Sequence, residues 1–258
     1  MEFECKNLYK VYTSPGRSVS ALEDVSFTVM RQEFVGIVGP SGCGKTTLLK
    51  IIAGLIKPTS GRITFGAVQP NGQPHNAMVF QEHALLPWLT VLDNVAFGLE
   101  MQGVKVRERY ERAGSFIEQI GLADFADSYP YQLSGGMCQR AAIARAFVAD
   151  PYMLLMDEPF SSLDAQTKVV LQEELLRIWR DHKKTVIYVT HDIEEAVLLS
   201  DRVLVMTGRP GRIRQEIPVS LDRPRSLLAR ESVEVKEIKW RIWKMLEAEV
   251  RQSLQLKK

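Results

Sequence analysis

The sequence predicts an α/β fold, in which a mostly parallel β-sheet carries helices on its faces, an antiparallel β part comes first and a helical lobe is inserted. Three observations predict it. Residues 3–38 alternate apolar and polar side chains as strands do, residues 85–149 have helical spacing, and strand-like and helix-like segments alternate after residue 150. A chain of 258 residues with 45% hydrophobic content can bury a large core in one or two domains.

The N-terminal strands come first. The segments FECKNLYKVY and DVSFTVM alternate in β fashion, and EFVGIVG is a short apolar run that ends in glycine. A helix follows in TTLLKIIAGL, and the Pro and Gly of KPTSG end it. RITF and AMVF predict two further strands.

The inserted lobe holds three predicted helices, with the sequences VLDNVAFGLEMQ, VRERYERAGSFIEQIG and GMCQRAAIARAFVA. After the lobe, the strands YMLLMD, TVIYVT and RVLVM alternate with helices, an order typical of a mostly parallel sheet. We expect a core of residues 1–84 and 150–220, a lobe of residues 85–149 and a C-terminal helical extension of residues 221–258.

The last predicted helix, EVKEIKWRIWKMLEAEV, is amphipathic. Its apolar stripe, which we expect to pack on its own domain, consists of Ile238, Ile242, Met245 and Leu246. Trp240 and Trp243 fit either a surface for a partner or the core, and the core is the commoner place for tryptophans on a terminal helix.

The composition limits which partners and which compartment we expect for the chain. A formal net charge of +2 gives no basic field of the kind that nucleic-acid binders carry, so we expect no nucleic-acid partner. Cys5, Cys43 and Cys138 have neither metal-ligand nor disulfide spacing, which suits the cytosol. The chain begins without an apolar leader, and no stretch reaches the roughly 18 apolar residues of a membrane span. We therefore expect a soluble chain.

A phosphate-binding loop is the strongest motif. GPSGCGKT fits the pattern GxxxxGK[ST] and stands between an apolar strand and a helix, as that motif requires. Glycines let backbone N–H groups curl around phosphate oxygens, Lys45 would reach the β and γ phosphates, and the Thr46 hydroxyl would join Mg²⁺. An ordinary Gly-rich turn would leave Lys45 unexplained. The residues expected to bind the phosphates are Gly39, Pro40, Ser41, Gly42, Cys43, Gly44, Lys45, Thr46 and Thr47.

Two adjacent acids end a later apolar strand. MLLMDEP places Asp157 and Glu158 where a parallel sheet presents side chains to its ligand crevice. Adjacent carboxylates there are costly without a cation, so Asp157 suits a Mg²⁺ role and Glu158 can polarise an attacking water.

A second glycine corner needs a different explanation. In LSGGMCQR, Ser134 can cap a helix whose N-terminus would attract an anion, yet one nucleotide needs only one phosphate loop. The corner would have difficulty reaching back over the nucleotide of its own chain. A two-fold dimer solves this problem, because each copy then supplies its corner to the γ-phosphate bound by the other.

With these motifs in order, the chain to about residue 220 resembles the ATP-binding subunit of an ABC transporter, a P-loop NTPase with a RecA-like core. The resemblance implies that Ser134, Gly135 and Gly136 form the signature motif that acts across the dimer. Met137 stands where many members of the family have Gln. ATP and Mg²⁺ are the implied cofactors.

The resemblance also assigns single residues. Gln81 in VFQEHALLPW matches the glutamine that touches Mg²⁺ and water and senses the membrane partner, and Asp164 in SSLD meets the other copy. His191 in VTHD matches the switch histidine at the γ-phosphate. Tyr12 stands where the family places an aromatic ring under adenine, with Tyr9 as the competing candidate.

Four segments resemble one subgroup of the ABC transporter subunits. LLPWLTVLDNVAFGLE, LSGGM, GRPGRI and LDRPR together resemble the importers of nitrate, aliphatic sulfonates, taurine and related small anions. The implied assembly is a homodimer at the cytoplasmic face of the inner membrane, bound to transmembrane permease subunits and served indirectly by an extracytoplasmic solute-binding protein.

Other functions stay open. An importer for another small solute would carry the same motifs. A soluble ABC ATPase of DNA repair or translation usually brings coiled-coil insertions, zinc modules or a duplicated cassette, and a P-loop kinase or GTPase would have no use for the LSGG corner.

Overall fold

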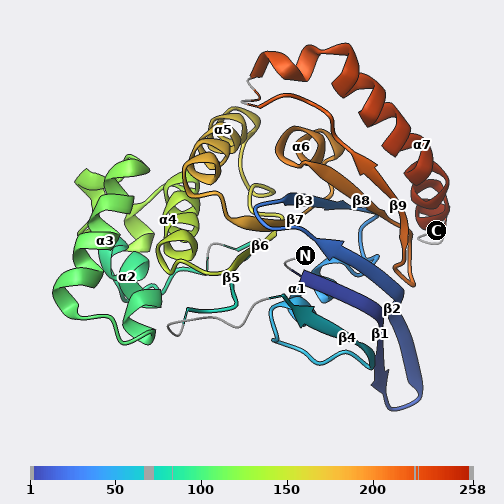
Figure 1. Ribbon diagram of the computed structural model, residues 1–258, viewed down its shortest axis with the longest axis horizontal. Helices are drawn as coiled ribbons and strands as arrows, with labels where there is room; N and C mark the ends of the chain where they lie inside the picture. The colour runs from blue at the N-terminus through green and yellow to red at the C-terminus, as the bar shows by residue number, and fades with distance from the viewer. Residues whose placement is uncertain (1–2, 67–72, 83, 224, 226, 256–258) are drawn as a thin grey trace. The chain divides into compact units, whose positions relative to one another are not determined.

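The structure is a computed structural model of the chain, and it describes residues 3–66, 73–82, 84–223, 225 and 227–255 (Figure 1). The chain forms two units, which are described separately below. Unit one consists of Met1–Val68 and Thr185–Lys258, and unit two consists of Gln69–Lys184. The expected division into a core of residues 1–84 and 150–220, a lobe of residues 85–149 and an extension stays a prediction.

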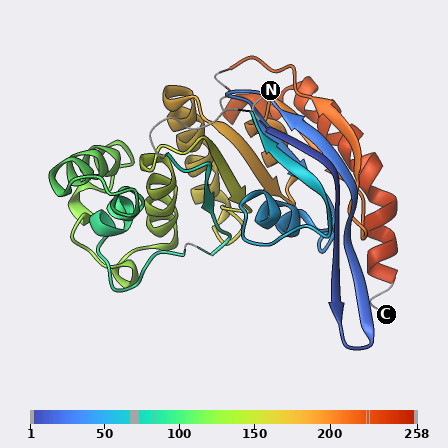
Figure 2. The same cartoon turned by 60° about the horizontal axis from the view of Figure 1, so that its bottom comes forward.

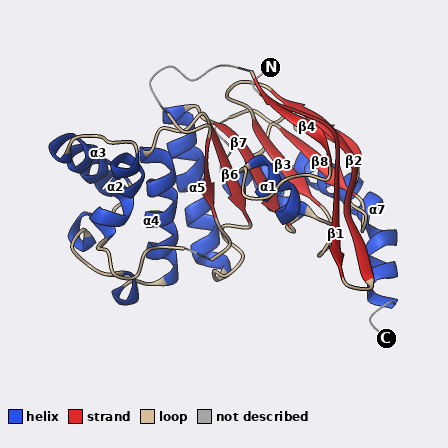
Figure 3. Ribbon diagram, turned by 90° about the horizontal axis from the view of Figure 1, so that it is seen from below, coloured by secondary structure: helices blue, strands red, loops and turns tan. Residues whose placement is uncertain are grey.

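Unit one begins with an antiparallel sheet of three strands. Its strands are β1 (Phe3–Ser14), β2 (Arg17–Val29) and β4 (Ser60–Phe65), in the order β2-β1-β4 (Figure 3). Alternate side chains of β1 turn inward, and the ring of Phe3 lies 5.7 Å from that of Phe27 and 5.5 Å from that of Phe65, centroid to centroid. This sheet confirms the expected antiparallel N-terminal part.

The second sheet of unit one is mostly parallel. Strands β7 (Thr185–Thr190), β3 (Phe34–Val38) and β8 (Arg202–Met206) are parallel, and β9 (Ile213–Pro218) pairs antiparallel with β8. The residues of β3 and β7 are all buried, which explains their unbroken apolar sequences. Strand β9 was not expected from the sequence. Its residues, IRQEIP, alternate between covered and exposed positions and include three polar residues in a row, so they give no apolar run.

Helices cover the second sheet. Helix α1 (Lys45–Ile52) contacts both β2 and β7, and α6 (Ile193–Leu199) contacts β3, β7 and β8. The 3-10 helix η4 (Leu227–Glu231) and α7 (Val233–Gln255) pack on α6 (Figure 1). Pro224 of the LDRPR segment lies outside the described residues.

The stripe expected on the last helix is confirmed. Ile242 and Leu246 belong to a buried cluster with residues of α6, β8 and β9, and Ile238 and Met245 pack against it. Trp240 and Trp243 are 57% and 40% exposed, so the interpretation of them as core residues is wrong.

Unit two joins two parallel strands to a group of helices. The strands are β5 (Asn76–Val79) and β6 (Met153–Asp157). The α-helices are α2 (Val91–Met101), α3 (Val106–Gln119), α4 (Gly135–Val148) and α5 (Ala165–His182), with short 3-10 helices η2 (Ala123–Phe125) and η3 (Pro130–Gln132). Figure 3 shows α2, α3 and α4 grouped together, and α2 contacts both of the others.

Side-chain caps fix where α2, α4 and α5 start. Thr90, Ser134 and Asp164 each accept a hydrogen bond from a backbone N–H of the helix that follows. The fully buried side chain of Asn94 holds the entry to α2, because it donates to the carbonyls of Leu86, Leu89 and Thr90 and accepts from the N–H of Leu86.

Across the part of the chain that the structure describes, no helix combines the length and the apolar character needed to cross a bilayer.

Arg225 anchors the end of α6. Its guanidinium donates to the carbonyls of Val197, Leu198 and Ser200, and also to those of Val219 and Leu221. Burial lowers the pKa of Arg225 to about 10, so the side chain still carries its charge at neutral pH.

We expect Arg225→Ala to lower the free energy of unfolding by about 3 kcal/mol, because several buried carbonyls would lose their donor. Urea denaturation of the variant measures this loss. Arg241→Ala, at an exposed position of α7, serves as the control and should keep the wild-type midpoint. Equal midpoints for both variants would contradict the anchoring role.

Candidate active site

The phosphate loop lies between β3 and α1 in unit one. Gly44, which precedes the first residue of α1, has φ 108°, a value that favours glycine. A Cβ at Gly44 would lie 2.7 Å from Cδ2 of Leu22 and 2.8 Å from the carbonyl oxygen of Ala21, so strand β2 leaves room for no other residue. The motif is therefore built into the packing of unit one.

Lys45 is held inside this loop. The side chain is 6% exposed, and Nζ donates to the carbonyls of Gly39 at 2.9 Å and Pro40 at 3.2 Å. The ammonium group thus lies at the start of α1, where the helix dipole also favours an anion. Burial raises the pKa of the Cys43 thiol, and the nearby charge of Lys45 offsets only part of this rise. The thiol therefore stays protonated.

Tyr12 lies beside the loop. It is 43% exposed on β1, its Oη is 3.4 Å from Oγ1 of Thr47 on α1, and Nζ of Lys10 is 5.0 Å from its ring centroid. Tyr9 is half-buried and in register with Ser60 of β4. An exposed ring next to the loop can stack on a planar group held there.

His191 reaches the same edge of the sheet as the loop. It follows β7, whose last residue, Thr190, pairs in register with Val38 at the end of β3. Gly39 follows Val38 directly, so two neighbouring parallel strands deliver the loop and the histidine together. The His191 side chain is exposed.

The backbone on both sides of His191 is fixed by residues that the sequence did not suggest. Thr190 donates its hydroxyl to the buried carboxylate of Glu195 and accepts from the N–H of Asp192 at 3.0 Å. Asp192 caps α6 by accepting from the N–H groups of Glu194 and Glu195, at 2.9 Å and 3.2 Å. The D-x-x-E spacing of a capping box was the available signal.

The acidic pair lies in unit two. Asp157 ends β6 and is 5% exposed, and Glu158 follows it with φ 46°. The carbonyl of Glu158 accepts from both N–H and Oγ of Ser161, at 3.1 Å and 2.9 Å. Left-handed backbone at a residue other than glycine costs about 1 kcal/mol and is concentrated at functional sites. Glu158 has this geometry.

Gln81 extends from the same end of unit two as the acids. Strands β5 and β6 are parallel, and Val79 is level with Met156. Gln81 comes two residues after Val79, and Asp157 comes one residue after Met156. The Gln81 side chain is exposed.

The glycine corner and the SSLD segment also meet in unit two. Ser134 caps α4 by accepting from the N–H of Met137 at 3.3 Å, and Asp164 caps α5 by accepting from Gln166 and Thr167. A Cβ at Gly136 would lie 2.9 Å from Cγ2 of Thr167, so the first turns of α4 and α5 are packed closely. Backbone hydrogen bonds, that from Thr167 first, lower the pKa of Asp164.

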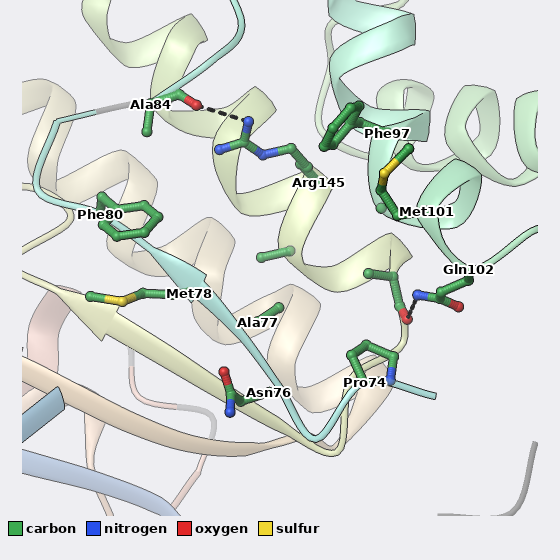
Figure 4. A pocket seen from close by; sticks show the side chains of 13 residues that line it. Pro74, Asn76, Ala77, Met78, Phe80, Ala84, Phe97, Met101, Gln102 and Arg145 are labelled. Atoms are coloured by element: carbon green, nitrogen blue, oxygen red, sulfur yellow. Dashed lines mark hydrogen bonds between the residues drawn. The ribbon is translucent and has the colours of Figure 1, made fainter. Parts of the chain in front are cut away.

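A hollow of about 560 Å³ also lies in unit two, bordered by β5, α2 and α4 (Figure 4). Phe80, Phe97 and Met101 give it an apolar lining. Arg145 donates to the carbonyl of Ala84 at 2.9 Å at its edge. Gln81 lies in the sequence between the lining residues Phe80 and Ala84.

Each unit thus gathers its own set of expected residues. Unit one brings together the loop of residues 39–47, Tyr12 and His191. Unit two brings together Gln81, Asp157 and Glu158 at one end of its strands, and the corner of residues 134–136 with Asp164 at the start of two helices.

Comparisons with known proteins agree with the motifs. A family model described as ABC transporter matches residues 22–161. An uncharacterized ABC transporter ATP-binding protein of Methanocaldococcus jannaschii is 50% identical over 255 residues, which cover 98% of this chain and 94% of that protein. The nitrate import ATP-binding protein of Synechocystis is 45% identical, with 86% and 84% covered. The taurine import ATP-binding protein of Pelagibacter ubique is 46% identical, with 82% and 80% covered.

A solved structure is also similar. It is the dimeric structure of an ATP-binding cassette in a post-hydrolysis state, bound to ADP and phosphate. It is 33% identical, with a TM-score of 0.74, and the match covers 85% of this chain and all of that one.

The geometry of Gly44 leads to a prediction. Gly44→Ala should abolish the binding of nucleoside triphosphates, because the new Cβ would overlap β2 and displace the loop. Gly54→Ala is the matched control, since Gly54 also has positive φ but has open space around its Cβ position. Both variants should lose about 1 kcal/mol of folding stability through strain. Titration with a fluorescent triphosphate should separate them, and equal affinities would contradict the packing argument.

Proposed function

Because the chain belongs to the ABC transporter family, we propose that it is the ATP-binding and ATP-hydrolysing subunit of an importer for a small anion such as nitrate, a sulfonate or taurine. Its ATPase activity follows from the family. The observation that carries the site assignment is the loop of residues 39–44, with Lys45 held inside it at the start of α1. This arrangement suits the phosphates of ATP.

The residues of unit one bind the nucleotide. Backbone N–H groups of the loop and the first turn of α1 receive the phosphates, and Lys45 exchanges its bonds to the Gly39 and Pro40 carbonyls for bonds to phosphate oxygens. Tyr12 stacks on the adenine. We prefer Tyr12 to Tyr9 for this role because its exposed ring lies beside the loop, with its hydroxyl next to that of Thr47. His191 lies at the same sheet edge and contacts the γ-phosphate.

The residues of unit two serve hydrolysis. Glu158 orients and polarises the attacking water, and its left-handed backbone turns the chain out of β6 at this residue. Gln81 positions the same water from the neighbouring strand. Glu158 accepts a proton from this water, and Gln81 helps to hold the water in place. Catalysis is therefore mainly a matter of positioning and electrostatics.

We propose Thr46, Gln81 and Asp157 as the residues that would supply oxygen ligands to Mg²⁺. Thr46 offers a hydroxyl, Gln81 an amide oxygen and Asp157 a nearly buried carboxylate, and such hard oxygen donors suit Mg²⁺. When bound, the ion neutralises charge on the β and γ phosphates.

The corner on α4 acts in the partner's site. Ser134 accepts one bond from its own helix, which leaves its hydroxyl proton to donate to phosphate. Gly135 and Gly136 add backbone N–H groups of the first turn, and the helix dipole favours the charge there. Asp164, at the adjacent start of α5, meets the other copy. Two copies therefore close over two ATP molecules in a head-to-tail dimer.

Closure of that dimer drives transport. We propose that the dimer works at the cytoplasmic face of the inner membrane, where it binds transmembrane permease subunits, and that an extracytoplasmic solute-binding protein delivers the solute. The apolar hollow next to Gln81 is our candidate for the permease contact, because Phe80 and Ala84 on either side of that glutamine line it. Hydrolysis reopens the dimer.

The substrate class rests on two observations. The segments GRPGRI, LDRPR and LSGGM resemble those of anion importers, and relatives named for nitrate and taurine import are 45% and 46% identical. Importers of other small solutes are the alternative. A soluble ABC ATPase of DNA repair or translation is disfavoured by the net charge of +2 and by the importer-like segments.

The experiment is Glu158→Gln, which keeps the shape of the side chain and loses its charge. Hydrolysis should fall by roughly two orders of magnitude or more, while ATP binding persists and the closed dimer accumulates by mass action. Size-exclusion chromatography with and without ATP·Mg²⁺ follows the dimer. A variant that hydrolyses ATP at the wild-type rate would contradict the role of Glu158.

The same variant tests the substrate class in cells that express the permease. Wild-type subunit should support uptake of labelled nitrate or taurine, and Glu158→Gln should not. Uptake of neither anion by the wild type, with normal ATP hydrolysis, would point to the other importers.

A further inference from the structure

The turn between β8 and β9, residues 207–212, has no role in the function proposed above. Two hydrogen bonds close it: the N–H of Thr207 donates to the Arg212 carbonyl at 3.0 Å, and the Thr207 hydroxyl oxygen accepts from the N–H of Arg212 at 3.0 Å. The same hydroxyl donates to the Pro210 carbonyl at 3.1 Å. The turn carries most of the GRPGRI segment.

This turn contacts the phosphate loop at two consecutive peptide groups. Arg209 donates from Nε and Nη2 to the carbonyl of Gly42, at 3.3 Å and 3.2 Å. Gly211 lies against the carbonyl of the next residue, Cys43, so closely that a Cβ at Gly211 would overlap that oxygen. The turn therefore holds the carbonyl groups of Gly42 and Cys43 in place.

Strand β2 pins the turn in place. Gly211 donates to the carbonyl of Ala21 and accepts from the N–H of Glu23, both at 3.0 Å. Ala21 and Leu22 are also the residues that limit the space at Gly44. The loop from Gly42 to Gly44 is thus packed against one continuous surface made by β2 and the turn.

This support matters for phosphate binding because a trans peptide directs its C=O and N–H to opposite sides. Holding the carbonyl of Cys43 on the turn directs the N–H of Gly44 away from the turn. The N–H of Cys43, whose peptide is held through the Gly42 carbonyl, closes the loop by donating to Pro40 at 3.2 Å. A phosphate cradle depends on such fixed N–H directions.

The C-terminal helix is tied to the turn. The carboxylate of Glu249 accepts from the N–H of Gly208, and Arg214 on β9 donates to the Met245 carbonyl at 2.7 Å. Figures 1 and 2 both show α7 alongside β9. The charge of Glu249 also reaches the loop, where it adds to the rise in the pKa of Cys43 that burial causes.

We propose that the β8–β9 turn positions the phosphate loop, with Arg209 as the positioning residue and Glu249 as the tie that links the turn to α7. The inference rests on the proposed role of the loop in binding ATP. It gives the C-terminal helix a function in nucleotide affinity.

The test compares two arginines of the same turn. Arg209→Ala should raise both the Kd of a fluorescent ATP analogue and the KM for ATP roughly three- to tenfold, the effect of losing one hydrogen bond of ordinary strength at an exposed position. The kcat and the melting temperature should change little. Arg209→Lys should recover part of the affinity, because it keeps the charge and a donor. Arg212→Ala is the matched control, since the Arg212 side chain pairs with Glu23 at 2.5 Å, and this exposed ion pair adds little to the two backbone hydrogen bonds that join Gly211 to β2.

A second pair of variants tests the tie. Glu249→Ala should raise the KM for ATP in the same way, and adding it to Arg209→Ala should raise the KM by less than the product of the two single effects. Glu247→Ala is the control on the same helix, because Glu247 pairs with Arg251 at 2.6 Å. A fully multiplicative effect would overturn the link through the turn.

Lys45→Ala separates the role of the turn from the role of the loop. If Lys45→Ala loses ATP binding and Arg209→Ala keeps wild-type Kd and KM, the positioning role is overturned and the loop assignment stands. If Lys45→Ala binds ATP as the wild type does, the loop assignment fails and the positioning role fails with it. Equal losses in Arg209→Ala and Arg212→Ala would reduce the effect to net charge and overturn the contact.

Discussion

The packing of one loop against one strand is the constraint on which the rest of the proposed site depends. Gly44 has space only for a hydrogen atom between itself and Ala21 and Leu22 of β2, and its φ of 108° turns the chain directly into α1. Because of this turn, Lys45 lies inside the loop and Thr47 lies beside Tyr12. The antiparallel sheet, which carries no expected catalytic residue, is therefore needed to shape the phosphate site.

Much of this was predictable because the central residues of β3, β6, β7 and β8 are buried and apolar, and because α2, α4, α5 and α6 begin at side-chain caps. Strand β9 was missed because its sequence IRQEIP buries few side chains, and it pairs only with β8 among the described strands. The two tryptophans of α7 were misjudged because a helix wheel gives the stripe that packs but not the depth to which neighbouring positions are covered.

In the proposed site, too, some residues were predictable from the sequence and others were not. The loop, the acidic pair and the glycine corner were predictable because their chemistry requires fixed residue types at fixed spacing. Supporting residues were not, since Arg209 acts on Gly42 from 167 positions away and Glu249 acts on Gly208 from 41 positions away. Such contacts come from the pairing of β8 with β9 and the docking of α7, which local patterns do not reveal.

We propose that each ATP site is completed by the Ser134 corner of a second copy. Mixed dimers test it, with Lys45→Ala on one copy and Ser134→Arg on the other, compared with dimers that carry both changes on one copy. If the corner acts across the dimer, separate changes damage the same composite site and leave the other whole, so ATP hydrolysis persists. Both changes on one copy damage each site once, and hydrolysis should be lost. Equal hydrolysis rates in the two arrangements would contradict the claim.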